Sequence, residues 1–310
     1  MIVLWIAVGL LAVVLLTAYV CFHIVFYSPS RKVSDEIPRL EGKEYDPVRE
    51  KMENWVKKAR ATDYREVSIK SFDGLTLRGR FYEYEKGAPI ELMLHGYRGT
   101  AERDLSGGIF RAFDLGHSVL TPDHRGSGRS DGHVITFGVK ETRDCEEWIR
   151  YIIENIDKDV KIFLTGVSMG AATVMMTSER ELPANVVGVL ADCGYTSAEA
   201  IIKDIMRRMK LPVPLLYPLV VLGGLIFGGF NVNKATPVEA VKKSRLPILF
   251  FHGDADDFVP YQMSLDNYEA CATEKRMVTI SGAGHGLCYP VDPDGYLAAM
   301  REFLEPYLQK

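Results

Sequence analysis

The sequence is short of cysteine and has none of the spacings that hold disulfide frameworks or zinc. Its cysteines are scattered singly and odd in number: Cys21, Cys145, Cys193, Cys271 and Cys288. An odd set without a Cys-X-X-Cys pair argues against a disulfide-linked extracellular domain and is typical of a reducing compartment. A chain of 310 residues can bury a sizeable core without such cross-links.

The sequence also lacks an excess of either charge. Lysine and arginine number 37 against 41 aspartate and glutamate, which gives a formal net charge of −4. A nucleic-acid-binding protein needs a basic patch, so this balance excludes nucleic acid as the expected partner. The sequence has no His-Glu-X-X-His motif and no phosphate-binding loop either, and it therefore predicts no metal and no cofactor.

Charge is missing altogether from residues 1–27, MIVLWIAVGLLAVVLLTAYVCFHIVFY. A membrane-spanning helix needs about 20 apolar residues, so this segment is long enough to cross a bilayer. The alternative is a cleaved signal peptide, which has a basic start, a shorter apolar core and a small-residue cleavage site. Nothing basic precedes the run and bulky residues end it, so the sequence favours an uncleaved anchor that contacts membrane lipid.

Basic residues follow this segment at Arg31 and Lys32, and the positive-inside rule then places the rest of the chain in the cytoplasm. We therefore expect a single-pass, membrane-anchored protein. Helical spacing of apolar residues predicts an amphipathic helix over residues 46–60. The expected division of the chain is an anchor over 1–27, a connector containing that helix over 28–62, and a larger domain over 63–310.

After the connector, apolar runs alternate with helical patterns. The expected strands are residues 66–70, 75–82, 90–94, 117–121, 160–165, 186–191, 248–251 and 277–280. Asp73-Gly74 separates the first two runs as a hairpin turn, so these strands should pair antiparallel. The later runs are continuously apolar, which is typical of parallel strands covered by helices on both faces. The sequence predicts an α/β fold with a mostly parallel, eight-stranded sheet.

A serine lies between two glycines where a strand gives way to a helix, in GVSMG (166–170). The G-X-S-X-G pattern at such a junction is a nucleophile elbow, a tight turn that exposes the serine oxygen above the sheet. Ser168 is therefore the candidate nucleophile. A serine hydroxyl is a poor nucleophile at neutral pH, so it needs a base, and the base needs an orienting acid.

Candidates for both follow Ser168 in the chain order of acid before histidine. Asp254, Asp256 and Asp257 lie in the loop after one apolar strand, and His285 lies in SGAGHG after the last strand. Both loops should lie at the carboxyl edge of the sheet, where ligands bind in open α/β sheets. Spacing alone does not choose among the three aspartates.

Acyl transfer also needs N–H donors for the oxyanion of the tetrahedral intermediate. One should be the backbone N–H of Met169, directly after the candidate nucleophile. The other should be the N–H of Tyr97, because His95-Gly96 would let the loop HGYRGT turn toward the site. The side chain of His95 is expected to be structural.

Five segments in this order resemble the α/β-hydrolase superfamily, and within it the serine-aminopeptidase-like and monoacylglycerol-lipase-like esterases. They are HGYRG (95–99), DHRGSGRSDG (123–132), GVSMG (166–170), HGDADDFVP (252–260) and GAGHG (282–286). The resemblance covers residues 64–310 and implies the α/β-hydrolase fold. The family pattern H-G-X-X-D-X-X-V-P selects Asp256 as the acid, and the family assigns Asp123 and Arg125 to a structural turn. Ser168 excludes the relatives with an aspartate nucleophile, such as haloalkane dehalogenases.

The segment LPVPLLYPLVVLGGLIFGGF (211–230) is apolar enough to resemble a second membrane span. A single span there would put the candidate nucleophile and its partners on opposite sides of the membrane. The resemblance implies instead that residues 197–231 form a small helical cap over the site. The expected pocket residues are Tyr195 after the sixth strand and Leu222 and Ile226 in the cap.

These features together predict a membrane-anchored serine hydrolase that cleaves short-to-medium acyl esters through an acyl-enzyme. A peptidase or amidase with the same residues is the first alternative, and a non-catalytic, membrane-tethered interaction module is the second. Removal of the anchor is expected to leave activity, because every candidate catalytic residue lies after Tyr64.

Overall fold

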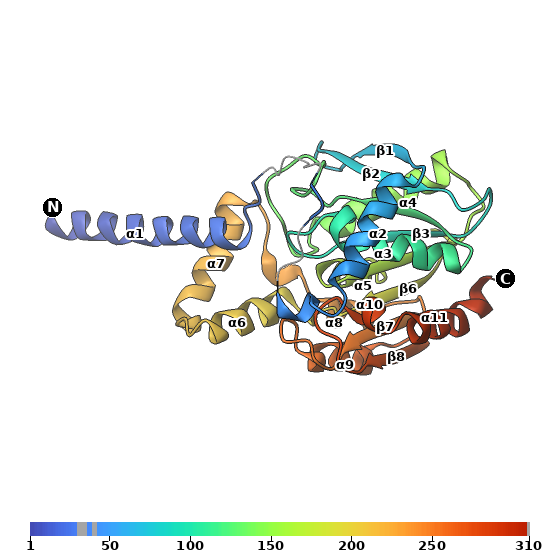
Figure 1. The fold of residues 1–310 in the computed structure, drawn as a ribbon. Helices are drawn as coiled ribbons and strands as arrows, with labels where there is room; N and C mark the ends of the chain where they lie inside the picture. Colours follow the sequence, from blue (N-terminus) through green and yellow to red (C-terminus); the bar gives the residue numbers. More distant parts are fainter. Residues whose placement is uncertain (30–35, 39–41, 309–310) are drawn as a thin grey trace.

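A computed structural model describes residues 1–29, 36–38 and 42–308. Within these residues, eight strands form one sheet in the order β1-β2-β4-β3-β5-β6-β7-β8 (Figure 1). Their bounds are β1 Arg65–Lys70, β2 Thr76–Tyr82, β3 Ile90–Leu94, β4 Ser118–Pro122, β5 Ile162–Val167, β6 Val186–Asp192, β7 Ile248–Gly253 and β8 Lys275–Ile280. β2 pairs antiparallel with β1 and with β4, and the other pairs are parallel. The predicted strands and the mostly parallel sheet are confirmed.

Helices connect most of the strands, and further helices precede the first strand and follow the last. Their bounds are α1 Ile2–Val25, α2 Arg49–Ala61, α3 Ala101–Asp114, α4 Glu141–Asn155, α5 Met169–Thr177, α6 Ala198–Arg208, α7 Val213–Phe227, α8 Pro237–Val241, α9 Tyr261–Ala270, α10 Cys288–Val291 and α11 Pro293–Leu308, with 3-10 turns η1 Lys43–Tyr45 and η2 Val232–Lys234. The buried face of α4 carries Cys145, Trp148 and Ile152 at helical spacing. Thr100 caps the start of α3, because its hydroxyl accepts a hydrogen bond from the Arg103 N–H at 3.1 Å.

Residues along each central strand alternate between two hydrophobic cores, one on each face of the sheet. On one face, Leu92, Leu164 and Phe250 pack with residues of α4 and α5. On the other face, Phe163 and Phe251 pack with residues of α11. Because helices cover both faces, the central strands are buried along their length, and the loops at their carboxyl ends are left to build a site.

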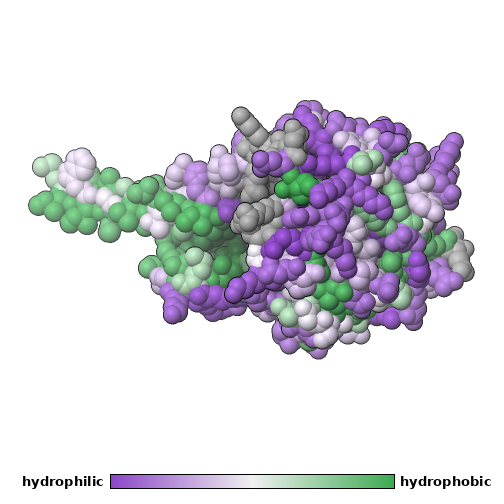
Figure 2. All heavy atoms as spheres, viewed as in Figure 1, coloured by the Kyte–Doolittle hydropathy of each residue, from purple (hydrophilic) through white to green (hydrophobic). Residues whose placement is uncertain are grey.

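α1 leaves the rest of the molecule as a projecting apolar rod (Figures 1 and 2). Residues 1–14 are exposed, whereas Ala18, Phe22 and Phe26 near its end are buried. In the described part of the chain, α1 is the single unbroken helix that is long and apolar enough to cross a membrane, and a signal sequence would meet the same criteria. Arg31 and Lys32, on which the predicted orientation depends, lie outside the described residues.

α6 and α7 form the small helical cap between β6 and α8, and α7 packs along the end of α1 (Figure 1). Gly223 permits this contact, because a Cβ there would lie 2.4 Å from the carbonyl oxygen of Ala18 and 3.1 Å from the Cβ of Phe22. The ring of Phe227 lies 5.1 Å from that of Tyr19, measured between centroids. One face of the apolar helix α7 therefore packs against α1.

Candidate active site

Ser168 lies in a strained turn between β5 and α5. Its φ of 57° is in the left-handed region, and its N–H donates to the carbonyl oxygen of Asp192 at 2.8 Å. A Cβ on Gly166 would lie 2.2 Å from the carbonyl carbon of Gly170, and a Cβ on Gly170 would lie 2.0 Å from the carbonyl oxygen of Leu94. Both glycines are thus required for the turn, which stores roughly 1–3 kcal/mol of backbone strain at the serine.

One chain of hydrogen bonds joins Ser168 to the two residues expected to support it. His285 Nε2 lies 2.9 Å from Ser168 Oγ, and His285 Nδ1 lies 2.7 Å from Asp256 Oδ2. The second carboxylate oxygen of Asp256 accepts hydrogen bonds from the N–H groups of Phe258 and Val259, each at 2.9 Å. The loops after β5, β7 and β8 therefore bring a hydroxyl, an imidazole and a carboxylate into line.

The three aspartates of the β7 loop have different surroundings. Asp254 accepts hydrogen bonds from the Gly282 N–H at 2.6 Å and the Ser281 hydroxyl at 3.1 Å, so it shapes the loop that carries His285. Asp257 is exposed at the rim. Among the described residues, Asp256 is the one of these three aspartates whose side chain contacts His285.

The charge on Asp256 is set by its neighbours. Burial alone would raise the pKa of Asp256, but hydrogen bonds from His252 and His285, together with their charge interactions, hold it below its usual range. His252 Nε2 lies 3.0 Å from the same Asp256 oxygen that contacts His285. The ionised carboxylate accepts the Nδ1 proton of His285, which leaves Nε2 free to accept the proton of Ser168.

The two candidate oxyanion donors lie on elements that meet at Ser168. Met169 is the first residue of α5, where an N–H has no acceptor inside the helix. Tyr97 follows Gly96, and a Cβ on Gly96 would lie 3.5 Å from the Cβ of Ser168. Neither the Tyr97 N–H nor the Met169 N–H donates to a backbone acceptor in the loops and caps of the described residues.

Two buried histidines hold the start of the Tyr97 loop from inside. The His124 N–H donates to His95 Nε2 at 2.9 Å, so His95 Nδ1 carries the proton that reaches the carbonyl oxygen of Gly96 at 2.8 Å. Burial lowers the pKa of His95 to about 4 and that of His124 to about 3, so both rings are neutral. Asp104 accepts a hydrogen bond from the Gly96 N–H at 3.1 Å.

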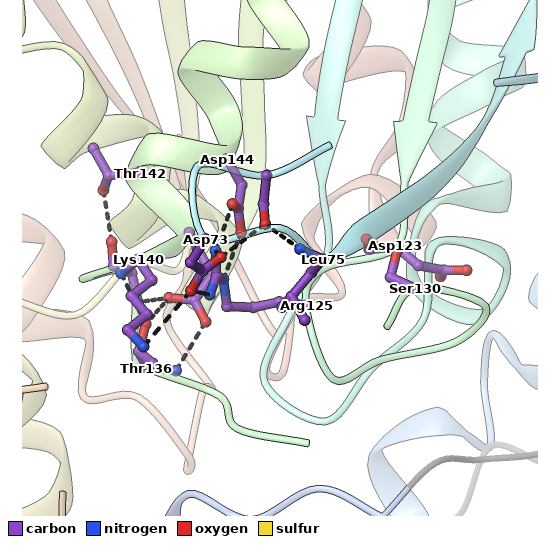
Figure 3. A network of polar contacts seen from close by, with 12 residues as sticks. Asp73, Leu75, Asp123, Arg125, Ser130, Thr136, Lys140, Thr142 and Asp144 are labelled. Atoms are coloured by element: carbon purple, nitrogen blue, oxygen red, sulfur yellow. Dashed lines mark hydrogen bonds and ion pairs between the residues drawn. The ribbon is translucent and has the colours of Figure 1, made fainter. Parts of the chain in front are cut away.

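A network of polar contacts fixes the turn after β4 (Figure 3). Asp123 accepts a hydrogen bond at 2.9 Å from the N–H of Ala101, the first residue of α3. Arg125 pairs with Asp144 at 2.7 Å and with Asp73 at 2.8 Å. These contacts fit the structural part that the resemblance implies for Asp123 and Arg125.

A cleft of about 290 Å³, open to solvent, lies at Ser168 and His285. Part of its wall comes from the segment before the sheet, through Glu44, Tyr45 and Met52. Our sequence analysis did not assign these three residues to the site. For Met52 the available signal was the amphipathic helix predicted over residues 46–60, since its apolar face required a partner, whereas Glu44 and Tyr45 precede that helix.

The expected pocket residues do not line this cleft. Tyr195 is buried and donates its hydroxyl to the carbonyl oxygen of Phe137 at 3.1 Å. Leu222 and Ile226 lie on α7, the helix that packs against α1, and Ile226 is 51% exposed. The expectation is corrected for this cleft, because α7 packs against α1 and into the hydrophobic cluster of Phe26 and Phe137, while its other apolar residues are exposed on the outside of the molecule.

One group of potential metal ligands appears in the described part of the chain. Cys193, Asp256 and His285 each offer an atom within 4.8 Å of the others. Burial raises the pKa of the Cys193 thiol well above its usual range, and Asp256 already accepts the proton of His285. A protonated thiol is a poor ligand, so the donor set favours the hydrogen-bonded arrangement over a metal.

Residues 92–299 match the model of the alpha/beta hydrolase family. An uncharacterized protein of Bacillus subtilis, YqkD, is 25% identical over 193 residues, which cover 62% of this chain and 63% of that protein. The lysophosphatidylserine lipase ABHD12 of Danio rerio is 26% identical over 206 residues, which cover 63% of this chain and 50% of that protein. The chain thus spans less than two thirds of both relatives.

Among solved structures, an esterase of Pyrococcus furiosus superposes with a TM-score of 0.67. The two chains are 22% identical, and the superposition covers 91% of this chain and 98% of the esterase. At this identity the likeness bears on the fold alone, and it confirms the α/β-hydrolase fold predicted from the sequence.

Proposed function

Because the chain belongs to the alpha/beta hydrolase family, we propose that it is a serine hydrolase that cleaves carboxylic esters through an acyl-enzyme. The observation that carries this proposal is the hydrogen-bonded line from Ser168 through His285 to Asp256, with Ser168 on a strained turn at an open cleft. A nucleophile, a base and an orienting acid in this geometry are the minimum that acyl transfer requires.

Each residue has a defined step in the proposed reaction. Ser168 Oγ attacks the acyl carbon while His285 Nε2 takes its proton, and the N–H groups of Tyr97 and Met169 bind the oxyanion. His285 then gives the proton to the departing alcohol. Water attacks the acyl-enzyme with His285 again as the base, and Asp256 stabilises the imidazolium in both halves of the reaction.

Ester substrates have more support than amides. The similar protein of Pyrococcus furiosus is named an esterase, and that of Danio rerio is named a lipase. One observation supports a peptidase or amidase activity. The carboxylates of Glu44 and Asp257 line the cleft, where they would bind a free amino group. For this reason the test must include amides.

The proposed location of the enzyme is a membrane, with the catalytic domain in the cytoplasm. α1 would span the bilayer, as its length and hydropathy permit. α7 packs on the end of α1 and exposes Leu215, Leu225 and Ile226, which continue the apolar surface of α1 (Figure 2). These residues would contact the same bilayer.

Turnover of matched substrates tests the proposed function. Purified full-length protein should hydrolyse chromogenic acyl esters, whereas the matching anilides should react slowly. Ser168→Ala should lower kcat on the order of 10³-fold or more. Ser68→Ala is the matched control, because Ser68 is exposed on the edge strand β1 and does not line the cleft. Faster cleavage of anilides would assign a peptidase or amidase, and no turnover of any substrate would favour a non-catalytic module.

A further inference from the structure

The last turn of α1 is hydrogen-bonded to the loop that carries Tyr97. The hydroxyl of Tyr97 donates to the carbonyl oxygen of Val25 at 2.7 Å. The guanidinium of Arg98 donates to the carbonyl oxygens of Ile24 at 2.7 Å and Tyr27 at 3.1 Å. Carbonyl groups at the end of a helix have no partner inside it, so two side chains of the loop satisfy acceptors that α1 would otherwise leave open.

The backbone of this loop is strained where it is bound to α1. Arg98 has a φ of 52°, in the left-handed region that non-glycine residues rarely adopt. Such a conformation costs roughly 1–3 kcal/mol and persists only where the surroundings enforce it. Here the enforcing contacts include the hydrogen bonds from Arg98 to α1. The turn that bears the Tyr97 N–H is therefore held in part by its contacts with α1.

Packing connects α1 to both candidate oxyanion donors. Phe26, at the end of α1, is fully buried, and its ring centroid lies 5.9 Å from that of Phe137. The Phe137 ring in turn lies 5.1 Å from the ring of Tyr97. Met169 belongs to the same hydrophobic cluster as Phe26 and Phe137, and Tyr97 packs against that cluster. A shift of α1 would therefore be transmitted to both sides of the oxyanion site.

The inner contacts hold the same peptide from the opposite side. The carbonyl oxygen of Gly96, which belongs to the peptide that bears the Tyr97 N–H, lies 2.8 Å from His95 Nδ1 and accepts a hydrogen bond from the Gly99 N–H at 3.1 Å. The side chains of residues 97 and 98 reach the other way, to α1.

We propose that the end of α1 is part of the catalytic site, and that Tyr97 and Arg98 are positioning residues whose side chains use α1 to aim the Tyr97 N–H at the oxyanion. The proposal rests on the proposed function, since it requires an oxyanion at Ser168. It also replaces the expectation that removal of the anchor leaves activity, because the anchor and the site share these contacts.

Two substitutions in the full-length chain test the proposal. Tyr97→Phe keeps the backbone N–H and the ring but removes the hydrogen bond to Val25. Arg98→Gly removes both bonds to α1 while relieving the strain at φ 52°. We expect each to lower kcat about 10-fold, since loss of a whole oxyanion donor costs about 10²–10³-fold. KM should stay within about twofold, because the donor acts on the transition state.

A boronic acid that forms a tetrahedral adduct with Ser168 gives a second readout, and its affinity should fall in parallel with kcat. Tyr217→Phe is the matched control, since it also removes one tyrosine hydroxyl bond, to Asn233 at 2.5 Å, but does not touch the loop. It should lower thermal stability without lowering kcat.

Three outcomes would overturn the proposal: parent-like kcat in Tyr97→Phe and Arg98→Gly, a loss confined to KM, or an equal loss of kcat in Tyr217→Phe. If Arg98→Gly fails to fold, Tyr97→Phe decides alone, because it preserves the ring packing. Failure of the proposed function looks different, since the parent protein itself would then show no turnover that depends on Ser168.

Discussion

Asp256 is set apart from Asp254 and Asp257 by its 2.7 Å hydrogen bond to His285 Nδ1, which its contact with His252 supports. Asp256→Asn should lower kcat by about 10³–10⁴-fold, because an amide favours the wrong imidazole tautomer and cannot stabilise the imidazolium. Asp257→Asn is the isosteric control and should keep nearly all activity. Asp254→Asn should be intermediate, since it weakens the contact with the Gly282 N–H. Steady-state kinetics check this ranking, and a larger loss in Asp257→Asn would contradict it.

The buried pair His95 and His124 should make stability depend on pH. Their native pKa values of about 4 and about 3 lie below the unfolded value near 6.5, so the unfolded chain binds more protons below about pH 6.5. Their contribution to the free energy of unfolding is complete above that pH. It falls as the pH drops toward 4, by up to about 1.4 kcal/mol per pH unit for each ring.

Thermal unfolding at about pH 7.5 and about pH 5 measures this effect. His124→Gln cannot titrate, so its melting temperature should change less between the two values than that of the parent protein. An unchanged pH dependence in His124→Gln would show that the ring has the same pKa in the native and unfolded states, which would contradict its burial as a neutral group.

Individual residues of the site were predictable to different degrees. Ser168 and His285 follow from short patterns at strand ends, because the elbow and the chain order restrict which residues can meet. The choice of Asp256 needed the family pattern. The side-chain role of Tyr97 was not predictable, since its acceptor is a backbone carbonyl 72 positions away, and backbone atoms leave no mark in a sequence.

At the scale of elements, α7 packs against α1, the helix whose end contacts the loop of Tyr97. At Gly223 any side chain would collide with the α1 backbone, at 2.4 Å from the Ala18 carbonyl oxygen. Gly223→Ala should therefore push the helices apart and lower kcat several-fold through the loop of Tyr97, despite the higher helix propensity of alanine. Gly9→Ala is the control, because a Cβ at Gly9 meets nothing within 4 Å. Equal activity in Gly223→Ala and Gly9→Ala would show that the packing of α7 against α1 does not affect catalysis.

The strands were predictable because burial on both faces produces continuous apolar runs between turn residues. The position of α7 was not, because an apolar helix has the same composition whether it faces a substrate, lipid or another helix. The adjacent glycines Gly223 and Gly224 were the one local signal. Glycine inside a helix costs up to about 1 kcal/mol relative to alanine, so a pair of them indicates close approach of another backbone.

The whole molecule combines a projecting apolar helix with a cap in which α7 exposes a further apolar surface (Figure 2). If α7 lies in the bilayer beside α1, a cysteine at Ile226 should resist a membrane-impermeant maleimide in membrane fragments open on both sides. Detergent should then make it reactive. Tyr84 lies just after β2 and is similarly exposed, so Tyr84→Cys should react in both conditions. Equal labelling of both cysteines in membranes would place α7 in water.

The central claim is that Ser168 is the nucleophile of a hydrolase. The most direct measurement is mass spectrometry of the full-length protein after reaction with a fluorophosphonate, followed by peptide mapping. We predict one adduct, on Ser168, that forms as ester hydrolysis is lost and is absent from Ser168→Ala and His285→Ala. Ester hydrolysis that continues without an adduct on Ser168, or an adduct on another serine that abolishes it, would contradict the account.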